Sequence, residues 1–150
     1  MELKTGSAGS TLDDKGRVSI PVRFREQFQG SLVITRGLDP CVWIMTPATW
    51  ETLKKNLSNS EIFPPEELRY YKDTLIDLNE EVKLDKVGRI AIPFSFRSYA
   101  NLTKECLVIS AGDRLSIWDS GEFNTHTKKG PPSVSDSLNK LGPGGVFNAG

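Results

Sequence analysis

The sequence predicts a mainly β protein with short helices, an α+β fold built from two repeats in one chain. Three observations support this fold class: a block of residues that occurs twice, apolar residues that alternate along short segments, and Gly and Pro residues that separate those segments. The 150 residues, 37% hydrophobic and 25% charged, suit one ordinary soluble domain. Two repeats are too few for a solenoid, which needs at least about three units, so we expect a closed two-part domain.

The repeated unit is a block of ten residues, because Leu12–Pro21 returns as Leu84–Pro93. Residues that recur 72 positions later include Asp13, Gly16, Arg17, Pro21, Phe24 and Arg25, which return as Asp85, Gly88, Arg89, Pro93, Phe96 and Arg97. This spacing divides the chain into a first repeat over residues 8–50, linking helices over 51–79, a second repeat over 80–123 and a tail over 124–150.

Each block predicts a tight turn between two short strands. Asp at the start of the turn can accept hydrogen bonds from the following backbone, and Gly at its end tolerates a positive φ, so residues 10–12 and 17–20 are expected to form a hairpin. Side chains alternate along a strand, which directs Val18 and Ile20 to an apolar face and Arg17 to a cationic face. The second copy repeats this alternation with Ile90, Ile92 and Arg89.

Short helices are expected after each block and between the repeats. Pro21 and Pro93 fix φ and suit a first helical turn, which predicts helices over 22–28 and 94–100. Apolar residues at spacings of three and four predict two linking helices, over 49–57 and from about 65 to 78.

Four apolar segments predict further paired strands, and the two ends of the chain predict little structure. The strand segments are 32–35, 41–45, 107–110 and 115–118, in which Trp43 and Trp118 are expected to anchor the core. Residues 1–9 are small and polar, so we expect no pairing before Ser10. From Asn124 the chain is rich in Gly, Pro, Ser, Asn and Thr without periodicity, which predicts a disordered tail over 124–150.

The composition argues against several classes of protein. The longest apolar run, residues 41–45, is far shorter than the roughly 18 residues of a membrane span, and residues 1–10 lack the apolar centre of a signal peptide, so a cytoplasmic protein is expected. Cys41 and Cys106 are widely spaced, which favours buried reduced thiols over a disulfide or a metal site. A single histidine, His126, and no Gly-rich phosphate loop predict neither an enzyme nor a cofactor.

The net charge of zero hides an uneven distribution of charge. Residues 51–81 carry four basic and eight acidic side chains, whereas residues 82–104 carry five basic and one acidic. A local positive face can therefore exist on a neutral protein.

Asp and Arg stand four residues apart in both blocks. An exposed ion pair of this kind contributes only ~0–1 kcal/mol to stability, and a single pair would indicate no more than that. The pair occurs twice at equivalent positions, as Asp13 with Arg17 and as Asp85 with Arg89, each time with Gly before the Arg. This recurrence favours a functional role over an ordinary surface ion pair. A held guanidinium presents planar donors that match phosphate oxygens or the O6 and N7 edge of guanine. We predict that Arg17 and Arg89 contact DNA bases or phosphates. The predicted backbone-positioning cations are Lys15, Lys86, Arg23 and Arg97.

These motifs together resemble the MraZ family of bacterial transcriptional regulators, relatives of the AbrB and SpoVT DNA-binding modules. The resemblance covers residues 6–123. It rests on Leu-Asp-x-Lys-Gly-Arg from Leu12, Ile-Thr-Arg-Gly-Leu-Asp from Ile34, Leu-Asp-x-x-Gly-Arg from Leu84 and Gly-Asp-Arg-Leu-Ser-Ile-Trp-Asp from Gly112. It implies that two AbrB-like repeats in one chain form a swapped-hairpin, double-psi β-barrel, and that the DNA-contacting Arg of the family falls on Arg17 and Arg89.

The resemblance also implies a function. Such proteins assemble into ring-like homo-oligomers, bind double-stranded DNA at promoter direct repeats on the nucleoid, and usually repress the division and cell-wall gene cluster. A second hypothesis stays open, because AbrB-like barrels also act as antitoxins that hold a toxin through an extended tail. Residues 124–150 could form such a tail and make the chain a protein-interaction module; their composition is unlike a helix of the family.

Overall fold

A computed structural model of the chain describes residues 4–58 and 64–129. The strands of this part are Thr5–Thr11 (β1), Arg17–Ser19 (β2), Ser31–Arg36 (β3), Val42–Met45 (β4), Asn79–Lys83 (β5), Arg89–Ala91 (β6), Glu105–Ala111 (β7) and Arg114–Asp119 (β8). The helices are Val22–Arg25 (α1), Pro47–Ser58 (α2), Pro65–Tyr71 (α3), Phe94–Tyr99 (α4) and Ser120–Lys129 (α5), with a π-helical turn over Lys72–Ile76 (η1). This mixture of strands and short helices confirms the predicted α+β class.

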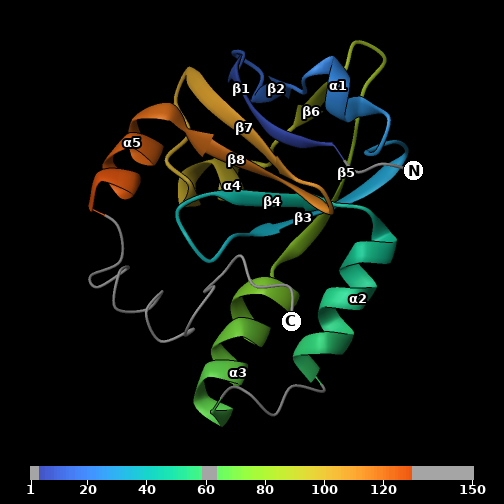
Figure 1. Cartoon of the computed structure of the whole chain (residues 1–150), viewed down its shortest axis with the longest axis vertical. Coiled ribbons are helices and arrows are strands. Elements are labelled where there is room, and N and C mark those ends of the chain that lie inside the picture. Colours follow the sequence, from blue (N-terminus) through green and yellow to red (C-terminus); the bar gives the residue numbers. More distant parts are fainter. Residues whose placement is uncertain (1–3, 59–63, 130–150) are drawn as a thin grey trace, which may run out of the picture.

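The two repeats share one antiparallel sheet of six strands, in the order β1-β7-β8-β4-β3-β5. Strands of the first repeat pair with strands of the second at three places in this sheet: β1 pairs with β7, β4 with β8, and β3 with β5. The linking helices α2 and α3 project from one end of the molecule, as Figure 1 shows. Neither repeat therefore completes its sheet without the other.

The remaining two strands, β2 and β6, form an antiparallel pair, here called the ribbon. Val18 lies opposite Ile90 in this pair, and two further backbone bonds extend it, from Ile20 N–H to Gly88 O and from Ile92 N–H to Gly16 O, both 2.8 Å. Isolated bridges connect Leu12 with Val18 and Leu84 with Ile90, so each ribbon strand also touches the segment that follows an edge strand of the sheet. The ribbon and α1 lie at the end opposite to α2 and α3 (Figure 1). Closure into a double-psi barrel stays a prediction.

The core is a single apolar cluster to which both repeats contribute equivalent residues. Val18 and Ile20 of the first repeat and Ile90 and Ile92 of the second are at most 2% exposed. Phe24 and Phe96 from the helices that follow the blocks are buried in the same cluster. The apolar face predicted for each block is thus confirmed. Trp118 is buried as predicted, whereas Trp43 is only half-buried.

The expectation that pairing begins near Ser10 is wrong, because β1 already starts at Thr5. Its residues are small and polar and carry no strand pattern, but all seven pair with β7, from Thr5 opposite Ala111 to Thr11 opposite Glu105. The hydroxyl of Ser110 also donates to the carbonyl of Lys4 over 2.7 Å. Tertiary pairing, and not intrinsic propensity, makes this segment a strand.

The predicted partner of residues 17–20 is also wrong. The tight turn is present, but β2 pairs along its length with β6 of the other repeat. It meets the segment before the turn through the isolated bridge between Leu12 and Val18 and a hydrogen bond from the Ser10 hydroxyl to Ser19 O. Both pairings satisfy the same alternation of apolar and polar residues, so the pattern alone cannot distinguish them.

The predicted helices exist with shifted ends. The first is shorter than expected, since α1 ends at Arg25 rather than at residue 28, and α4 ends at Tyr99. The linking helix α2 extends from Pro47 to Ser58. The second linking helix changes from α to π geometry at Lys72 and ends at Ile76, two residues before the predicted end.

The tail does not begin at residue 124 as predicted, because α5 continues through Lys129. Burial by itself raises the pKa of Asp119, but hydrogen bonds from Thr103 and from the backbone of Glu122 outweigh it and leave this pKa below its ordinary value. The resulting carboxylate caps the start of α5. Phe123 packs edge-on against Trp118, with ring centres 5.2 Å apart. The rest of the predicted tail, residues 130–150, lies outside the described residues.

Candidate nucleic-acid interface

The two turns before the ribbon strands are built in the same way. The backbone of Asp13 exchanges two hydrogen bonds with the turn: its N–H donates to Arg17 O over 2.9 Å, and its carbonyl accepts from Gly16 N–H over 3.0 Å. The equivalent bonds at Asp85 are 2.8 Å to Arg89 O and 3.1 Å from Gly88 N–H. The φ angles of Gly16 and Gly88 are +78° and +89°, which side chains with a Cβ adopt only under strain. The turn chemistry predicted from the repeated block is confirmed.

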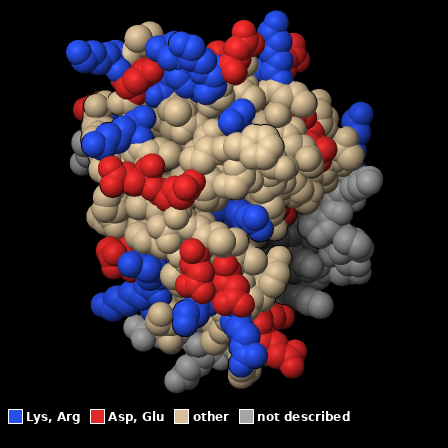
Figure 2. All heavy atoms as spheres, turned by 180° about the vertical axis from the view of Figure 1, so that it is seen from behind, with Lys and Arg blue, Asp and Glu red and all other residues tan. Residues whose placement is uncertain are grey.

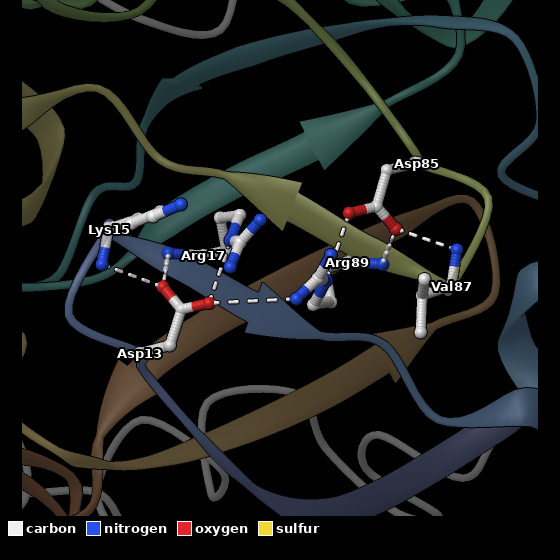
Figure 3. A network of polar contacts seen from close by, with 6 residues as sticks. All are labelled: Asp13, Lys15, Arg17, Asp85, Val87 and Arg89. Atoms are coloured by element: carbon white, nitrogen blue, oxygen red, sulfur yellow. Dashed lines mark hydrogen bonds and ion pairs between the residues drawn. The ribbon is translucent and has the colours of Figure 1, made fainter.

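The aspartate side chains hold the arginines in place (Figure 3). Arg17 donates from its backbone N–H to Asp13 Oδ1 over 2.9 Å and from Nε to Oδ2 over 2.7 Å. Arg89 does the same with Asp85, at 2.8 and 2.9 Å. Each carboxylate therefore binds both the backbone and the side chain of its arginine, which is more than an ordinary surface ion pair does.

The two pairs also touch each other across the ribbon. Arg89 Nη1 lies 3.9 Å from Asp13 Oδ2, the oxygen that accepts the bond from Arg17, whereas no ion pair between Arg17 and Asp85 is found in the described residues. Figure 3 shows the two guanidinium groups side by side on neighbouring strands, between the two carboxylates. One oxygen of Asp13 thus offsets the repulsion between the two arginines.

Hydrogen bonding keeps both carboxylates charged. The backbone N–H of Arg17 is the main cause that lowers the pKa of Asp13 below its ordinary value, with further bonds from the Arg17 side chain and the Lys15 backbone. The pKa of Asp85 is lowered in the same way, first by the backbone N–H of Arg89. Both arginines are consequently held by anions at any pH near neutrality.

The ribbon has one buried face and one charged face. Val18 and Ile90 are fully buried, while the arginine side chains on the other face are each 28% exposed. The bonds to the aspartates use Nε, so the Nη groups of Arg17 have no hydrogen-bond partner in the part of the chain that the structure describes. These groups can donate to a ligand without breaking the turn.

The other predicted cations differ in how they are placed. Lys15 and Lys86 are exposed at the tips of the two turns. Arg23 is exposed and donates from Nη2 to Ser7 O of β1 over 2.7 Å. Arg97 is half-buried and donates from Nε to Ile92 O over 2.9 Å.

Sequence reasoning did not assign Arg25 to this site. It is the counterpart of Arg97 and donates from Nε to Ile20 O over 2.7 Å. The two arginines cross between repeats, because Arg97 lies against Gly16 of the first repeat and Arg25 against Gly88 of the second. Recurrence of Arg25 as Arg97 was the signal that could have identified it. Together these residues brace each turn with the helix of the opposite repeat.

Charge gathers at the ribbon end of the molecule. Figure 2 shows Lys and Arg side chains grouped there, interleaved with Asp and Glu, at the end that carries β2, β6 and α1.

Among the described residues no group of three or more His, Cys, Asp and Glu could hold a metal ion. Cys41 and Cys106 are buried free thiols as predicted, and burial raises their pKa to about 12 and about 11. No helix in residues 4–58 and 64–129 combines the length and apolarity needed to cross a membrane.

Comparison with known protein sequences places the chain in a family. The family model described as "MraZ protein, putative antitoxin-like" matches residues 5–72 and 75–137. Proteins named transcriptional regulator MraZ from Clavibacter michiganensis subsp. michiganensis and Saccharopolyspora erythraea are each 34% identical over 139 residues, covering 93% of this chain and 96% of the relative. The protein of that name from Treponema denticola is 34% identical over 140 residues, covering 92% and 96%. The two matched segments contain one block each, so the chain belongs to the MraZ family.

Proposed function

We propose that this protein is a transcriptional regulator that binds double-stranded DNA sequence-specifically with the ribbon. One observation carries the proposal: two arginines of neighbouring strands stand side by side on one exposed face, each fixed at backbone and side chain by its own aspartate. The relatives' printed name, transcriptional regulator, supports it.

The shape and chemistry of the ribbon suit the major groove. A two-stranded ribbon fits this groove, where a guanidinium can donate two hydrogen bonds to O6 and N7 of guanine. Asp13 and Asp85 preorganise the arginines, so less side-chain entropy is lost on binding. Lys15, Lys86 and Arg23 are exposed near the same face and can contact phosphates, which set the register of a protein on DNA. Arg97 contributes charge from a more buried position.

A single ribbon has few cations, and its arginines are already paired with carboxylates. Binding by one subunit is therefore weak, and neighbouring subunits that engage successive DNA repeats gain affinity through effective concentration. Head-to-tail contacts between identical subunits form rings. We accordingly propose a ring-like homo-oligomer on promoter direct repeats of the nucleoid, acting as a repressor of the division and cell-wall gene cluster. The resemblance of the repeated motifs to the MraZ family supports these finer statements.

The test is fluorescence anisotropy with labelled duplexes over a salt series. One duplex carries direct repeats from upstream of the protein's own gene, and the other carries the same bases scrambled. Arg17→Ala and Arg89→Ala are each expected to weaken binding to the repeats by about 1–3 kcal/mol if the arginine reads a guanine, with little change on the scrambled duplex. If the arginine contacts a phosphate, both duplexes weaken alike and the salt slope falls by about 1.

Lys55→Ala is the matched control, because it removes the same charge from an exposed position on α2, at the other end of the molecule. Circular dichroism melting verifies that the arginine variants fold. Equal affinity of the wild type for both duplexes would refute sequence-specific binding and favour a protein-interaction role of residues 124–150.

A further inference from the structure

The two turns of the ribbon differ in side-chain chemistry at the exposed position two residues before the arginine. Lys15 occupies it in the first repeat and Val87 in the second. The backbone N–H of each donates to Oδ1 of the turn aspartate over 2.9 Å, so the two residues are structurally equivalent. At this position the first half of the ribbon presents an ammonium, and the second half presents an isopropyl group.

Val87 is unusual for a residue at the tip of a turn. It is 63% exposed, one of the most exposed large apolar side chains in the described part of the chain. A β-branched side chain has few rotamers, and here its backbone is fixed by Asp85, the same carboxylate that binds Arg89. Figure 3 shows Val87 and Arg89 as neighbours held by one aspartate. The isopropyl group is therefore fixed relative to the guanidinium and contributes nothing to the core.

A rigid apolar group beside an arginine has a specific counterpart in DNA. Thymine is the base that exposes a methyl group in the major groove, and small apolar side chains contact it there. Because Arg89 suits a guanine, Val87 suits a thymine close to that guanine. Lys15, at the equivalent place, suits a phosphate or an acceptor on a base edge and gains nothing from a methyl group.

We propose that Val87 is a specificity-determining residue that contacts the 5-methyl group of a thymine in the half of each site bound by the second repeat. This inference rests on the proposed DNA-binding function. A thymine contact by Val87 gives the ribbon a direction along the DNA, since its two halves then read different bases although their backbones match. A site read in this way is not a palindrome, and successive sites then repeat in one direction.

The experiment replaces each thymine of the repeat-carrying duplex, one at a time, with deoxyuridine, which removes only the methyl group. With the wild type we expect one thymine per repeat at which affinity falls about threefold to fivefold, the worth of one buried methyl group. With Val87→Ala the loss of affinity caused by deoxyuridine at that position should be less than about half of the loss seen with the wild type. With Val87→Lys it should be abolished, and the salt dependence of binding should steepen as a cation is added.

Lys15→Ala is the matched control, because it should weaken binding to the thymine and uracil duplexes by the same factor. Specific binding with no deoxyuridine effect at any position, or with the same effect in wild type and Val87→Ala, would overturn the assignment and leave the proposed function standing. No preference of the wild type for the repeats would overturn both. A preference that persists in Arg17→Ala and Arg89→Ala would overturn the ribbon as the site.

Discussion

The two halves of the ribbon agree on the buried face and differ on the exposed face. Below the ribbon, Val18 and Ile20 correspond to Ile90 and Ile92, all at most 2% exposed. Above it, the arginines and aspartates match, but Lys15 corresponds to Val87 and Asp14 to Lys86. The face that packs the core retains the same kind of residue in both copies, and the face available to a ligand does not. This contrast separates residues that build the ribbon from residues that we propose give it selectivity.

The largest expected effect tests the buried half of this comparison. Ile20→Ala and Ile92→Ala should each lower the free energy of unfolding by about 2–5 kcal/mol, because both leave a cavity in the shared core. Urea denaturation measures the loss. Val22→Ala, 74% exposed and next to the same block, is the control and should change stability little. A large loss in one isoleucine variant with none in the other would contradict the equivalence of the two copies.

A smaller effect distinguishes two glycines that share one backbone conformation. A Cβ at Gly88 would lie 2.1 Å from Arg25 Cζ, whereas a Cβ at Gly16 would lie 2.9 Å from Arg97 Cζ. We expect Gly88→Ala to destabilise by about 2–3 kcal/mol, from the positive φ and the displaced Arg25 bond to Ile20 O. For Gly16→Ala about 1–2 kcal/mol is expected.

Urea denaturation of the two glycine variants decides whether crossing arginines brace the turns. The double variant Gly88→Ala with Arg25→Ala should lose less than the sum of its single changes, since the clash disappears with the guanidinium. Equal losses at Gly16 and Gly88, with strict additivity, would show that the arginines do not constrain the turns.

The smallest effect is the pH dependence contributed by the turn aspartates. Their pKa is lowered in the folded state, so the stability that each contributes is fully present above the ordinary value of 3.8 and is lost as pH falls through the lower folded value. Asp13→Asn should remove this contribution. The stability difference between wild type and variant, measured by urea denaturation from pH 6 to pH 3, should thus shrink at the acidic end. The stability difference between wild type and Asp85→Asn should change less with pH, because Asp13 also contacts Arg89. A difference that grows on acidification would reverse the assignment.

Much of the fold and site was predictable because the block that forms the turn and the ribbon strand occurs twice in the sequence. The turn residues, the Asp13–Arg17 and Asp85–Arg89 pairs and the buried isoleucines follow from local chemistry and alternation, which one sequence reveals. The partner of β2 was not predictable, because alternation places side chains on faces but does not select the strand that pairs. The strand from Thr5 was missed for a related reason, since its Gly and Ser residues become a strand only through pairing with β7.

The missed residues have physical explanations too. The helix α5 continues past Asn124 because Asp119 caps its start and Phe123 packs on Trp118, neither of which changes the polar composition of the segment. Arg25 contacts a glycine of the other repeat, and such a contact becomes visible only when the repeats are brought together. Val87 resembles any exposed turn residue until its backbone bond to Asp85 is known.

The pairing of β2 with β6 also determines when, during folding, the charged face of the ribbon forms. Residues 18 and 90 must meet before the ribbon forms, and residues 5 and 111 must meet before β1 is fully paired with β7 in the sheet. Contacts this distant in sequence slow folding, since a long loop closes before they stabilise anything. During synthesis, a chain that ends within the first repeat or the linking helices has no second strand for its ribbon. An incompletely synthesised chain therefore lacks the face that we propose to bind DNA.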